Sequence, residues 1–514
     1  MHIKELNLEL ELLRGAVPVW HGSIAAAQLQ PACEKVRAGG GSLVALWGSD
    51  ERARQGGFAL HAALLTLDGL VCLTLPLDAA HPAYPDVSAI FPQAQRMQRA
   101  AYDMLGIHAQ GGEDHRKWLR HGAWPAGTFP LRKDFDARQS SPGETDAYPF
   151  VQVEGQGVHE IAVGPVHAGI IEPGHFRFSV VGEKVLRLEE RLGYVHKGIE
   201  KRFESMALAD GYRLAGRVSG DSTVAYAWAY AMAAESIAGV TPPDRALWLR
   251  ALLLERERIA NHLGDLGYLG NDVALTFGFA QFWILKEEVL RNNATLFGHR
   301  YLMDRIVPGG VASDLAEESK QVILDECVRL EREVAVLRAI YDDHAGVQDR
   351  FIATGRVAPT LAAKLGLTGL AGRASGQAWD QRVQFPCAPY DELEVRVAAY
   401  RNGDVAARVI VRFEEIFESL RLCREILARL PAGDIVVPLP DAAAGLGIGI
   451  VEGWRGEVLV AIHAGEHGEL RRVHPHDPSW QNWPLLEHAV MGNIVPDFPL
   501  INKSFNLSYS GHDL

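Results

Sequence analysis

The chain has 514 residues, which is long enough for several domains and a large buried core. Its 48% of hydrophobic and 22% of charged residues are typical of a globular protein. The formal net charge of −13 excludes a general nucleic-acid binder, because a phosphate backbone is attracted to a basic surface.

The cysteines of the chain form no C-x-x-C pair; they are Cys33, Cys72, Cys327, Cys387 and Cys423. An odd and scattered set predicts a reducing compartment and no disulfides, and we expect no iron–sulfur cluster or other cofactor bound by this chain. The first residues lack the apolar core of a signal peptide, and no run of about 18 apolar residues follows. We therefore expect no direct membrane span and a cytoplasmic protein that reaches a membrane only through partners.

Residues 1–135 are predicted to form a small α/β domain. A helix is expected at Ala94–Leu105. Short apolar segments separated by Gly and Asp predict strands at Ser42–Trp47, Phe58–Leu67 and Gly69–Leu75. The following stretch is rich in Asp, Ser, Gly and Pro around Ser140-Ser141-Pro142-Gly143, and it predicts a linker over residues 136–150.

Residues 151–514 form the second predicted domain. Strands are expected at its start, at His159–Val166 and Phe176–Val181. Long helices follow, and Pro242-Pro243-Asp244 is predicted to open the first of them with proline in its first turn.

Two apolar stripes, Ile323–Tyr341 and Val409–Leu430, recur at three- and four-residue steps and predict helices that pack together. Cys327 and Cys423 lie on these stripes, so we expect them to fill the core. The run Glu255-Arg256-Glu257-Arg258 is predicted to be a solvated helix face with local ion pairs.

The segment Gly445–Val451 is rich in glycine, as a nucleotide-binding loop would be. No helix is expected after it, so we predict a β-turn region instead and assign Trp454 and Arg455 to packing. No dinucleotide fingerprint is present, so this segment is not expected to bind a dinucleotide.

The N-terminal domain carries the motifs Tyr84–Pro92, Tyr102–Ile107 and Pro130–Asp134. Together these motifs resemble the small hydrophilic subunit of respiratory complex I. One departure is Gln98-Arg99-Ala100, which replaces the acidic residues usual before the second motif.

The second domain carries a longer series of motifs: Gly164–His167, Glu172–Arg177, Gly193–Glu200, Glu257–Leu263, Gly372–Gly376 with Asp380 and Arg382, and Pro389-Tyr390. Their order and spacing resemble the large subunit of membrane-bound nickel–iron hydrogenases of the hydrogenase-4 and formate hydrogenlyase type, and its relative, the quinone-site subunit of complex I. The resemblance implies an α+β multidomain fold, with an N-terminal α/β domain and a mainly helical hydrogenase-like domain flanked by small sheets.

Four thiolates hold nickel and iron in such hydrogenases, in two C-x-x-C pairs. The corresponding positions here are Ser219, Ser222, Ser508 and Gly511. A neutral hydroxyl is a poor substitute for a soft thiolate, and glycine has no side chain. We therefore expect the nickel site to be lost. The sequence ends at Leu514, without the extension that hydrogenase precursors lose after nickel insertion, which agrees with this expectation.

His167 and His175 are the first candidates for chemistry. Two imidazoles that titrate near neutral pH could deliver protons to a reduced quinone. Alternatively, each is a satisfied polar residue of a tight turn shaped by Pro173-Gly174. Complex I has a quinone-binding tyrosine and a second histidine near these motifs, and here Gly220 and Ile171 occupy those positions.

His196 and Glu200 are spaced to share one face of a helix. The resemblance places them against a partner subunit that carries an iron–sulfur cluster, and it implies that they tune or shield electron transfer there. The alternative is a solvated helix face.

The resemblance also brings four charged residues towards the former metal pocket: Arg217, Asp221, Arg373 and Asp380. Buried charges are costly unless they are paired, so we expect Arg/Asp pairs among them. Such pairs could bind a polar headgroup, relay protons, or hold together the segments that nickel once bridged.

The leading hypothesis is an oxidoreductase subunit of a complex-I-like assembly on the inner face of the cell membrane. Electrons would arrive from an iron–sulfur small subunit and a ferredoxin-like subunit, and a quinone would be reduced in this chain. Integral membrane subunits would couple that step to proton or cation translocation. The alternative is a redox-inactive structural adapter, and a working hydrogenase would need thiolates that the sequence lacks.

Overall fold

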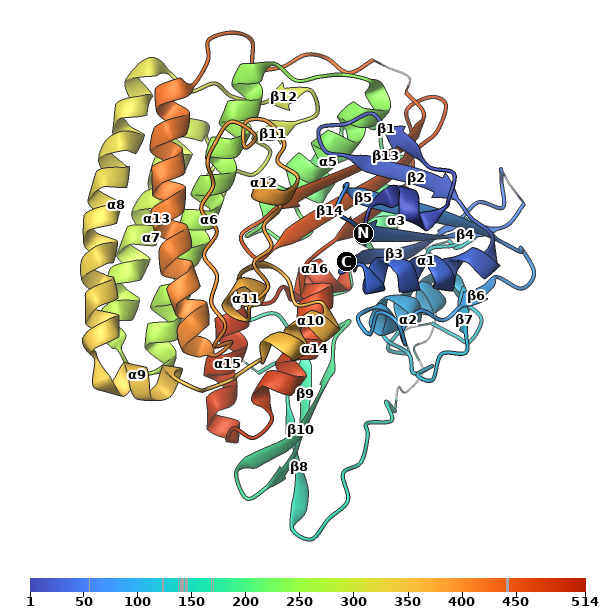
Figure 1. Cartoon of the computed structure of the whole chain (residues 1–514), viewed down its shortest axis with the longest axis horizontal. Helices are drawn as coiled ribbons and strands as arrows, with labels where there is room; N and C mark the ends of the chain where they lie inside the picture. Colours follow the sequence, from blue (N-terminus) through green and yellow to red (C-terminus); the bar gives the residue numbers. More distant parts are fainter. Residues whose placement is uncertain are drawn as a thin grey trace.

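The computed structural model describes residues 1–54, 56–122, 124–136, 138, 143, 147–167, 169, 171–440 and 443–514. The centre of the predicted linker, Ser140-Ser141-Pro142, lies outside the described residues. Figure 1 shows an N-terminal α/β part beside a group of long helices, with small sheets between and below them. The fold class predicted from the sequence is confirmed.

The N-terminal part is built on a five-stranded sheet in the order β1-β2-β5-β4-β3, in which only β2 and β5 run parallel. Its elements are η1 Ile3–Leu6, β1 Glu11–Leu13, β2 Val19–Ser23, α1 Ala26–Ala38, β3 Ser42–Asp50, β4 Phe58–Leu65, β5 Leu70–Leu77, β6 Ala83–Pro85, α2 Ala94–Leu105 and β7 His108–Gln110. The three strands and the helix expected here are confirmed. β4 is buried along its whole length because other elements cover both faces of the sheet, and the ring of its His61 meets that of His463 at 4.7 Å.

A second sheet, in the order β10-β9-β8, projects from the lower part of the molecule in Figure 1. Its strands are β8 Val158–Val163, β9 His175–Val181 and β10 Lys184–Arg191, close to the two strands that were predicted. The turn that joins β8 to β9 carries His167, and β9 begins at His175.

The helices α6, α7, α8 and α13 lie side by side (Figure 1) and pack against one another in pairs. The elements of this region are α3 Ile199–Phe203, α4 Tyr212–Ala215, α5 Thr223–Ala238, α6 Asp244–Asp272, α7 Thr276–Phe297, β11 Ile306–Val307, β12 Gly310–Val311, α8 Glu317–Asp343, α9 Ala345–Phe351, α10 Pro359–Leu365, α11 Gly369–Ala374, α12 Gln381–Gln384 and α13 Val405–Arg429. Both predicted apolar stripes are confirmed as the buried faces of α8 and α13, and Cys327 and Cys423 are buried on them. Pro243 is the N-cap of α6, one residue before the predicted first turn.

The predicted solvated face at Glu255-Arg256-Glu257-Arg258 is wrong, because all four side chains are buried. α6 packs against α5, α7 and α13, so this part of the helix does not reach water. The side chains have partners in the protein instead: Arg256 pairs with Glu326 at 2.6 Å, and the carboxyl group of Glu257 accepts the backbone N–H of Val224 at 2.7 Å. Arg258 donates to the carbonyl groups of Glu452 and Gly453.

The C-terminal part returns to a three-stranded sheet in the order β13-β14-β15. Its elements are β13 Gly445–Glu452, β14 Glu457–Ala464, β15 Leu470–His476, α14 Ser479–Val490, η2 Val495–Asp497, α15 Phe498–Phe505 and α16 Tyr509–Asp513. The glycine-rich segment is a strand that ends in a tight turn, as predicted, and no helix follows the turn. Among the described helices, none is both long and apolar enough to cross a membrane.

Candidate functional site

Three segments that are far apart in the sequence meet beside the helices: the turn between β8 and β9, the loop before α5, and the end of the chain. Glu172 of the turn accepts a hydrogen bond from the backbone N–H of Ser510, with an N–O distance of 3.0 Å. The hydroxyl oxygens of Ser219, in the loop, and Ser508 lie 2.9 Å apart. The fold therefore brings the histidine-bearing turn and the two serine motifs into one region.

The four positions that resemble metal ligands are bonded to one another or to neighbouring protein groups. The Ser219 hydroxyl donates to Asp221 at 2.8 Å, and the Ser508 oxygen accepts the backbone N–H of Gly511 at 2.8 Å. A side chain at Gly511 would overlap the carboxylate of Asp477. Two mutually bonded hydroxyls without a thiolate do not fit nickel or iron. Within the part of the chain that the structure describes, no group of three or more His, Cys, Asp or Glu side chains is arranged to hold a metal ion.

Arg455, at the tip of the β13–β14 hairpin, joins these segments. Its guanidinium binds both carboxylate oxygens of Asp221, at 2.9 and 2.6 Å, and donates to the Ser222 hydroxyl at 3.2 Å. Its Nε donates to the carbonyl of Asn506 near the C-terminus at 2.6 Å. A two-pronged pair of this kind is among the strong polar interactions of proteins. Asp221 is expected in this pocket from the resemblance, whereas Arg455 is expected from the sequence only to pack.

The electrostatics of the pair follow from its surroundings. Burial raises the pKa of Asp221, but Arg455 and the hydroxyl of Ser219 lower it further, so that the carboxyl group stays below its usual range. Arg455 also lies over the ring of Trp454, with 3.9 Å between the guanidinium carbon and the ring centroid. Asp221 is therefore ionised at neutral pH, and Arg455 is held in one orientation.

His167 and His175 each use one ring nitrogen to bind the backbone of the turn. The Nδ1 of His167 lies 3.2 Å from the carbonyl oxygen of Pro165, and the Nδ1 of His175 lies 3.2 Å from that of Gly164. A carbonyl oxygen only accepts, so in each neutral ring Nδ1 carries the proton and Nε2 the lone pair. Both Nε2 atoms are buried and have no hydrogen-bond partner among the described residues. Each ring can therefore accept one more proton, although burial lowers the pKa of His175.

Tyr509 is a candidate that sequence reasoning missed. Its ring lies 6.3 Å from that of His167, and its buried hydroxyl has the side chain of Asn502 as a hydrogen-bonding neighbour. A Cβ atom at Gly174 would lie 2.6 Å from the tyrosine ring, so this glycine makes room for it. Burial raises the pKa of Tyr509, which keeps the hydroxyl protonated as a donor. Tyr509 lies within the Ser508–Gly511 motif, and this position could have marked it as a candidate. Its contact with His167 is formed only in the folded protein.

His196 and Glu200 do not share a helix face. α3 begins at Ile199, after Gly198 in the left-handed conformation with φ of 66°. His196 therefore lies in the loop before the helix, and its Nδ1 is 2.7 Å from the carbonyl oxygen of Asp513. The prediction of a shared face was wrong because the chain turns at Gly198.

Glu200 points into the core rather than towards solvent. Its Oε1 lies 2.7 Å from the Nδ1 of His474 and 2.6 Å from the guanidinium of Arg472. Burial raises the pKa of Glu200, but Arg472 and His474 together bring it down to about 2. The solvated-face alternative is therefore wrong for this residue. The predicted role of His196 and Glu200 beside a partner's cluster stays a prediction.

Arg373 and Asp380 are buried and lie 3.6 Å apart, as a pair of the expected kind. They belong to a network deeper in the domain, where Arg373 also binds Glu415 at 2.8 Å and Glu452 at 2.7 Å. Asp380 pairs more closely with Arg382, at 2.7 Å. This network lies behind the hairpin that carries Arg455.

Arg217 departs from the expectation that it faces the pocket. It forms a two-pronged pair with Asp304, at 2.7 and 2.8 Å, and its side chain is 44% exposed. Asp304 lies in the loop after α7, so this pair ties two surface loops together. A role for Arg217 in cofactor binding stays a prediction.

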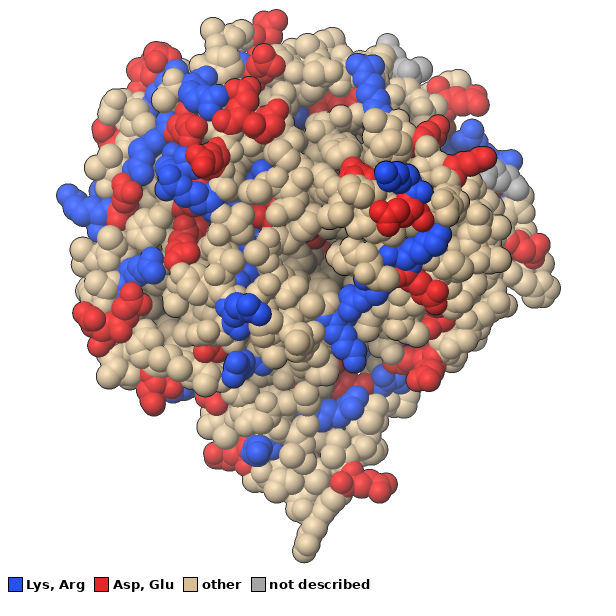
Figure 2. Space-filling view, in the orientation of Figure 1, with Lys and Arg blue, Asp and Glu red and all other residues tan. Residues whose placement is uncertain are grey.

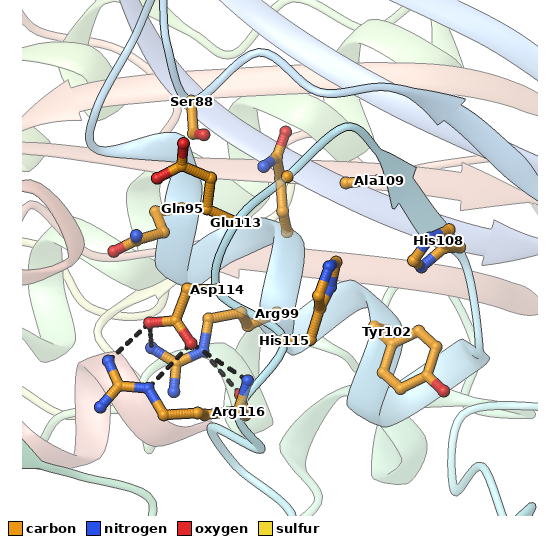
Figure 3. Close-up of a pocket in the computed structure, with 12 residues that line it drawn as sticks. Ser88, Gln95, Arg99, Tyr102, His108, Ala109, Glu113, Asp114, His115 and Arg116 are labelled. Carbon is orange, nitrogen blue, oxygen red and sulfur yellow. Dashed lines mark hydrogen bonds and ion pairs between the residues drawn. The ribbon is translucent and has the colours of Figure 1, made fainter. Parts of the chain in front are cut away.

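A separate hollow of about 160 Å³ lies in the N-terminal domain. Figure 3 shows Asp114 between Arg99 and Arg116, with His108 and His115 beyond Arg99 in this view. The ion-pair distances from the Asp114 carboxylate are 3.2 Å to Arg99 and 2.6 Å to Arg116. Arg99 is one of the residues that replace the usual acidic ones, and Asp114 balances its charge. Asp114 thus pairs with both arginines of this hollow.

The fold and the site define a large subunit of the complex I and hydrogenase type that has no thiolate ligands. Residues 23–141 match the family described as "Respiratory-chain NADH dehydrogenase, 30 Kd subunit", and residues 272–445 match "Respiratory-chain NADH dehydrogenase, 49 Kd subunit". Formate hydrogenlyase subunit 5 of Escherichia coli (strain K12) is 32% identical over 486 residues, which cover 92% of this chain and 85% of the relative. Hydrogenase-4 component G of the same organism is 31% identical over 485 residues, which cover 92% and 84%.

A solved structure shows the same fold. A chain of the membrane-bound sulfane sulfur reductase (MBS), an archaeal respiratory membrane complex, superposes with a TM-score of 0.66 at 24% identity and covers 70% of this chain and 99% of that chain. The chain belongs to the superfamily of complex I and membrane-bound hydrogenase large subunits, in the form in which the 30 kDa and 49 kDa domains are fused. The predicted resemblance is confirmed, and the family consists of subunits of oxidoreductase complexes.

Proposed function

We propose that this chain forms the acceptor site of a membrane-attached, complex-I-like oxidoreductase, in which a quinone-like molecule is reduced. Electrons would reach the site from iron–sulfur clusters of partner chains, a small subunit and a ferredoxin-like subunit. Integral membrane subunits would anchor the chain to the inner face of the membrane and couple the reaction to ion translocation. Any NAD chemistry would belong to other subunits.

The observation that carries this proposal is the pair formed by His167 and Tyr509. The histidine has a buried Nε2 lone pair without a partner in the described part of the chain, and the tyrosine has a buried hydroxyl that burial keeps protonated. Reduction of a quinone to a quinol needs two electrons and two protons. In our proposal the Tyr509 hydroxyl donates a hydrogen bond to one carbonyl, and His167 passes both protons to the quinone in turn, taking the second from His175.

His175 would act one step behind this pair. Its ring is tied to the same turn as that of His167, and its Nε2 is also free of partners among the described residues. Because burial lowers its pKa, it holds a proton only briefly at neutral pH. That property suits a relay that passes a proton on rather than storing it.

A second candidate, a redox-inactive structural adapter, is favoured by a different observation. The hydrogen bond between Ser219 and Ser508 and the Arg455–Asp221 pair already hold together the segments that four metal ligands would join. In that case the pocket is a structural junction, and the chain transmits conformational change between soluble partners and the membrane arm.

The test is quinone reduction by the native assembly, purified with its partners and supplied with a low-potential electron donor and a short-chain quinone. We expect His167→Gln to lower the rate by about 100-fold, the lower end of the effect of a positioned acid–base group, and Tyr509→Phe to lower it as well. The matched control is His159→Gln, an exposed histidine on β8, which should leave the rate unchanged. An intact assembly that reduces no acceptor would support the adapter instead.

A further inference from the structure

A cavity of about 430 Å³ opens between the N-terminal domain and the large domain. Residues 39–44 and 65–67 line it on one side, and Thr368, Trp379 and Glu457 line it on the other. Figure 2 shows a hollow near the centre of the face drawn, where the N-terminal domain meets the segments around α10 and α11. Cavities of this size at domain interfaces admit solvent and small molecules. Within the described ranges, none of the residues assigned above to the acceptor site lines it.

The wall of this cavity contains a buried carboxyl group without a cation. Glu457 is 6% exposed, and its carboxylate accepts a hydrogen bond from the Thr368 hydroxyl at 3.0 Å. No Lys, Arg or His of the described chain lies within ion-pair distance of it. Directly across the β13–β14 pairing lies a second carboxyl group, that of Glu452. Glu452 is bound by Arg373 at 2.7 Å and by the backbone N–H of Gln381 at 3.1 Å.

The ion-pair network around Glu452 has no positive charge that is not already balanced by a carboxylate. Ion pairs join three arginines to four carboxylates: Arg258, Arg373 and Arg382 to Glu255, Asp380, Glu415 and Glu452. His262, 2.7 Å from Glu415, adds at most one further positive charge. Four cations would then face four carboxylates, and Glu457 would be the fifth. Two neighbouring buried carboxylates are not both ionised unless a cation compensates them, so one proton must be retained.

We propose that Glu457 is a proton-exchange site on the wall of the interdomain cavity: its carboxyl group takes a proton from cavity water, holds it beside Glu452, and releases it by the same route. The step moves one proton and no electrons. It stands whether or not the assembly reduces a quinone. Of the two carboxyl groups, Glu457 is the one that holds the proton, because Arg373 forms an ion pair with Glu452 and not with Glu457.

The groups that face Glu457 agree with this role. Burial and the neighbouring Glu452 raise its pKa to about 8, whereas Thr368, Trp379 and Arg373 lower it. Burial and Asp380 also raise the pKa of Glu452, against the effect of Arg373. The other polar residues on the cavity wall are Arg37, whose guanidinium donates to the carbonyl oxygens of Ala363 and Lys364, and the uncharged Ser42, Thr66, Gln377 and Gln481. A carboxyl group with these neighbours is protonated at neutral pH and titrates just above it.

Infrared spectroscopy of the full-length chain tests this inference, because a protonated carboxyl group has its own C=O stretching band, which shifts in D₂O. We expect a band that disappears with a midpoint near pH 8, loses intensity in Glu457→Gln, and is absent when Glu457→Gln is combined with Glu257→Gln. Glu257, whose pKa burial also raises to about 8, is a second source of such a band, so Glu257→Gln is measured in parallel and must leave the first band in place. Glu466→Gln, at an exposed position, is the unchanged control.

Two further variants keep the proposal falsifiable if Glu457→Gln folds poorly. Thr368→Val removes a hydrogen bond to the ionised form and should move the midpoint to higher pH. Glu452→Gln removes the neighbouring negative charge and should move it to lower pH by about one pH unit or more. A band near pH 8 that survives in the double variant Glu257→Gln/Glu457→Gln, or a midpoint that neither Thr368→Val nor Glu452→Gln moves, would overturn the assignment.

Discussion

The Arg455–Asp221 pair is predicted to hold together the segments that meet in the pocket. Arg455→Met removes the guanidinium and keeps most of the apolar stem over Trp454. Breaking a fully buried ion pair by removing one partner costs about 3–5 kcal/mol. The Asp221 side chain is 37% exposed, so water compensates part of that loss, and we expect a loss of about 2 kcal/mol in the free energy of unfolding.

The assay is urea unfolding followed by tryptophan fluorescence, with the slope compared between variants. Arg455→Met, Asp221→Asn and the double variant form a cycle, and we expect the double variant to lose less than the sum of the two single losses. The matched control is Arg217→Met, whose pair with Asp304 is largely exposed and should contribute no more than about 1 kcal/mol.

The pH dependence gives the same prediction a second check. The pKa of Asp221 is lowered in the folded state, so the contribution of the pair is complete above the ordinary value of 3.8 and is lost as the pH falls through the lower folded value. Between pH 5 and 8, the contribution of Asp221 to the stability of the wild type should therefore stay constant. Strictly additive losses in the cycle, or a loss no larger than that of Arg217→Met, would refute the reasoning.

Two further predictions concern Glu257 and Gly174. Burial raises the pKa of Glu257 from 4.5 to about 8, so folding retains a proton and stability falls as the pH rises from 4.5 to 8, by at most about 5 kcal/mol at 1.36 kcal/mol per pKa unit. Urea midpoints at pH 5 and 8 should therefore differ less in Glu257→Gln than in wild type, and an equal difference would contradict this. Gly174→Ala places a methyl group 2.6 Å from the Tyr509 ring and should destabilise the protein by about 1–3 kcal/mol in a thermal shift assay and lower quinone reduction, whereas unchanged values would show that the ring moves freely.

The regular elements were predictable because their signals are local. The stripes on α8 and α13 have the helical period, and β3, β4 and β5 are short apolar runs bounded by turn residues, so the pattern alone identifies them. The burial of Glu255-Arg256-Glu257-Arg258 was not predictable in the same way. An alternating charge run is typical of a solvated face, and only the packing of other elements around α6 supplies the partners that allow it to be buried.

The residues of the candidate site were also predictable only in part. Ser219, Ser508 and His167 were found because they lie in or beside recognisable motifs, and the structure brings them into one region. Arg455 and Tyr509 were not, because their roles depend on partners in distant parts of the sequence, Asp221 and His167. Sequence spacing predicts contacts within one element, but it does not predict contacts between elements that only the fold brings together.

The most direct test of the central claim is the metal content of the native assembly, measured together with its quinone reduction. We predict iron from partner clusters, no stoichiometric nickel, and quinone reduction that falls when His167 is replaced. Stoichiometric nickel bound to this chain would contradict the account, because Ser219, Ser222, Ser508 and Gly511 offer no thiolate to hold it. An iron-containing assembly without nickel that reduces no acceptor would contradict the acceptor-site proposal.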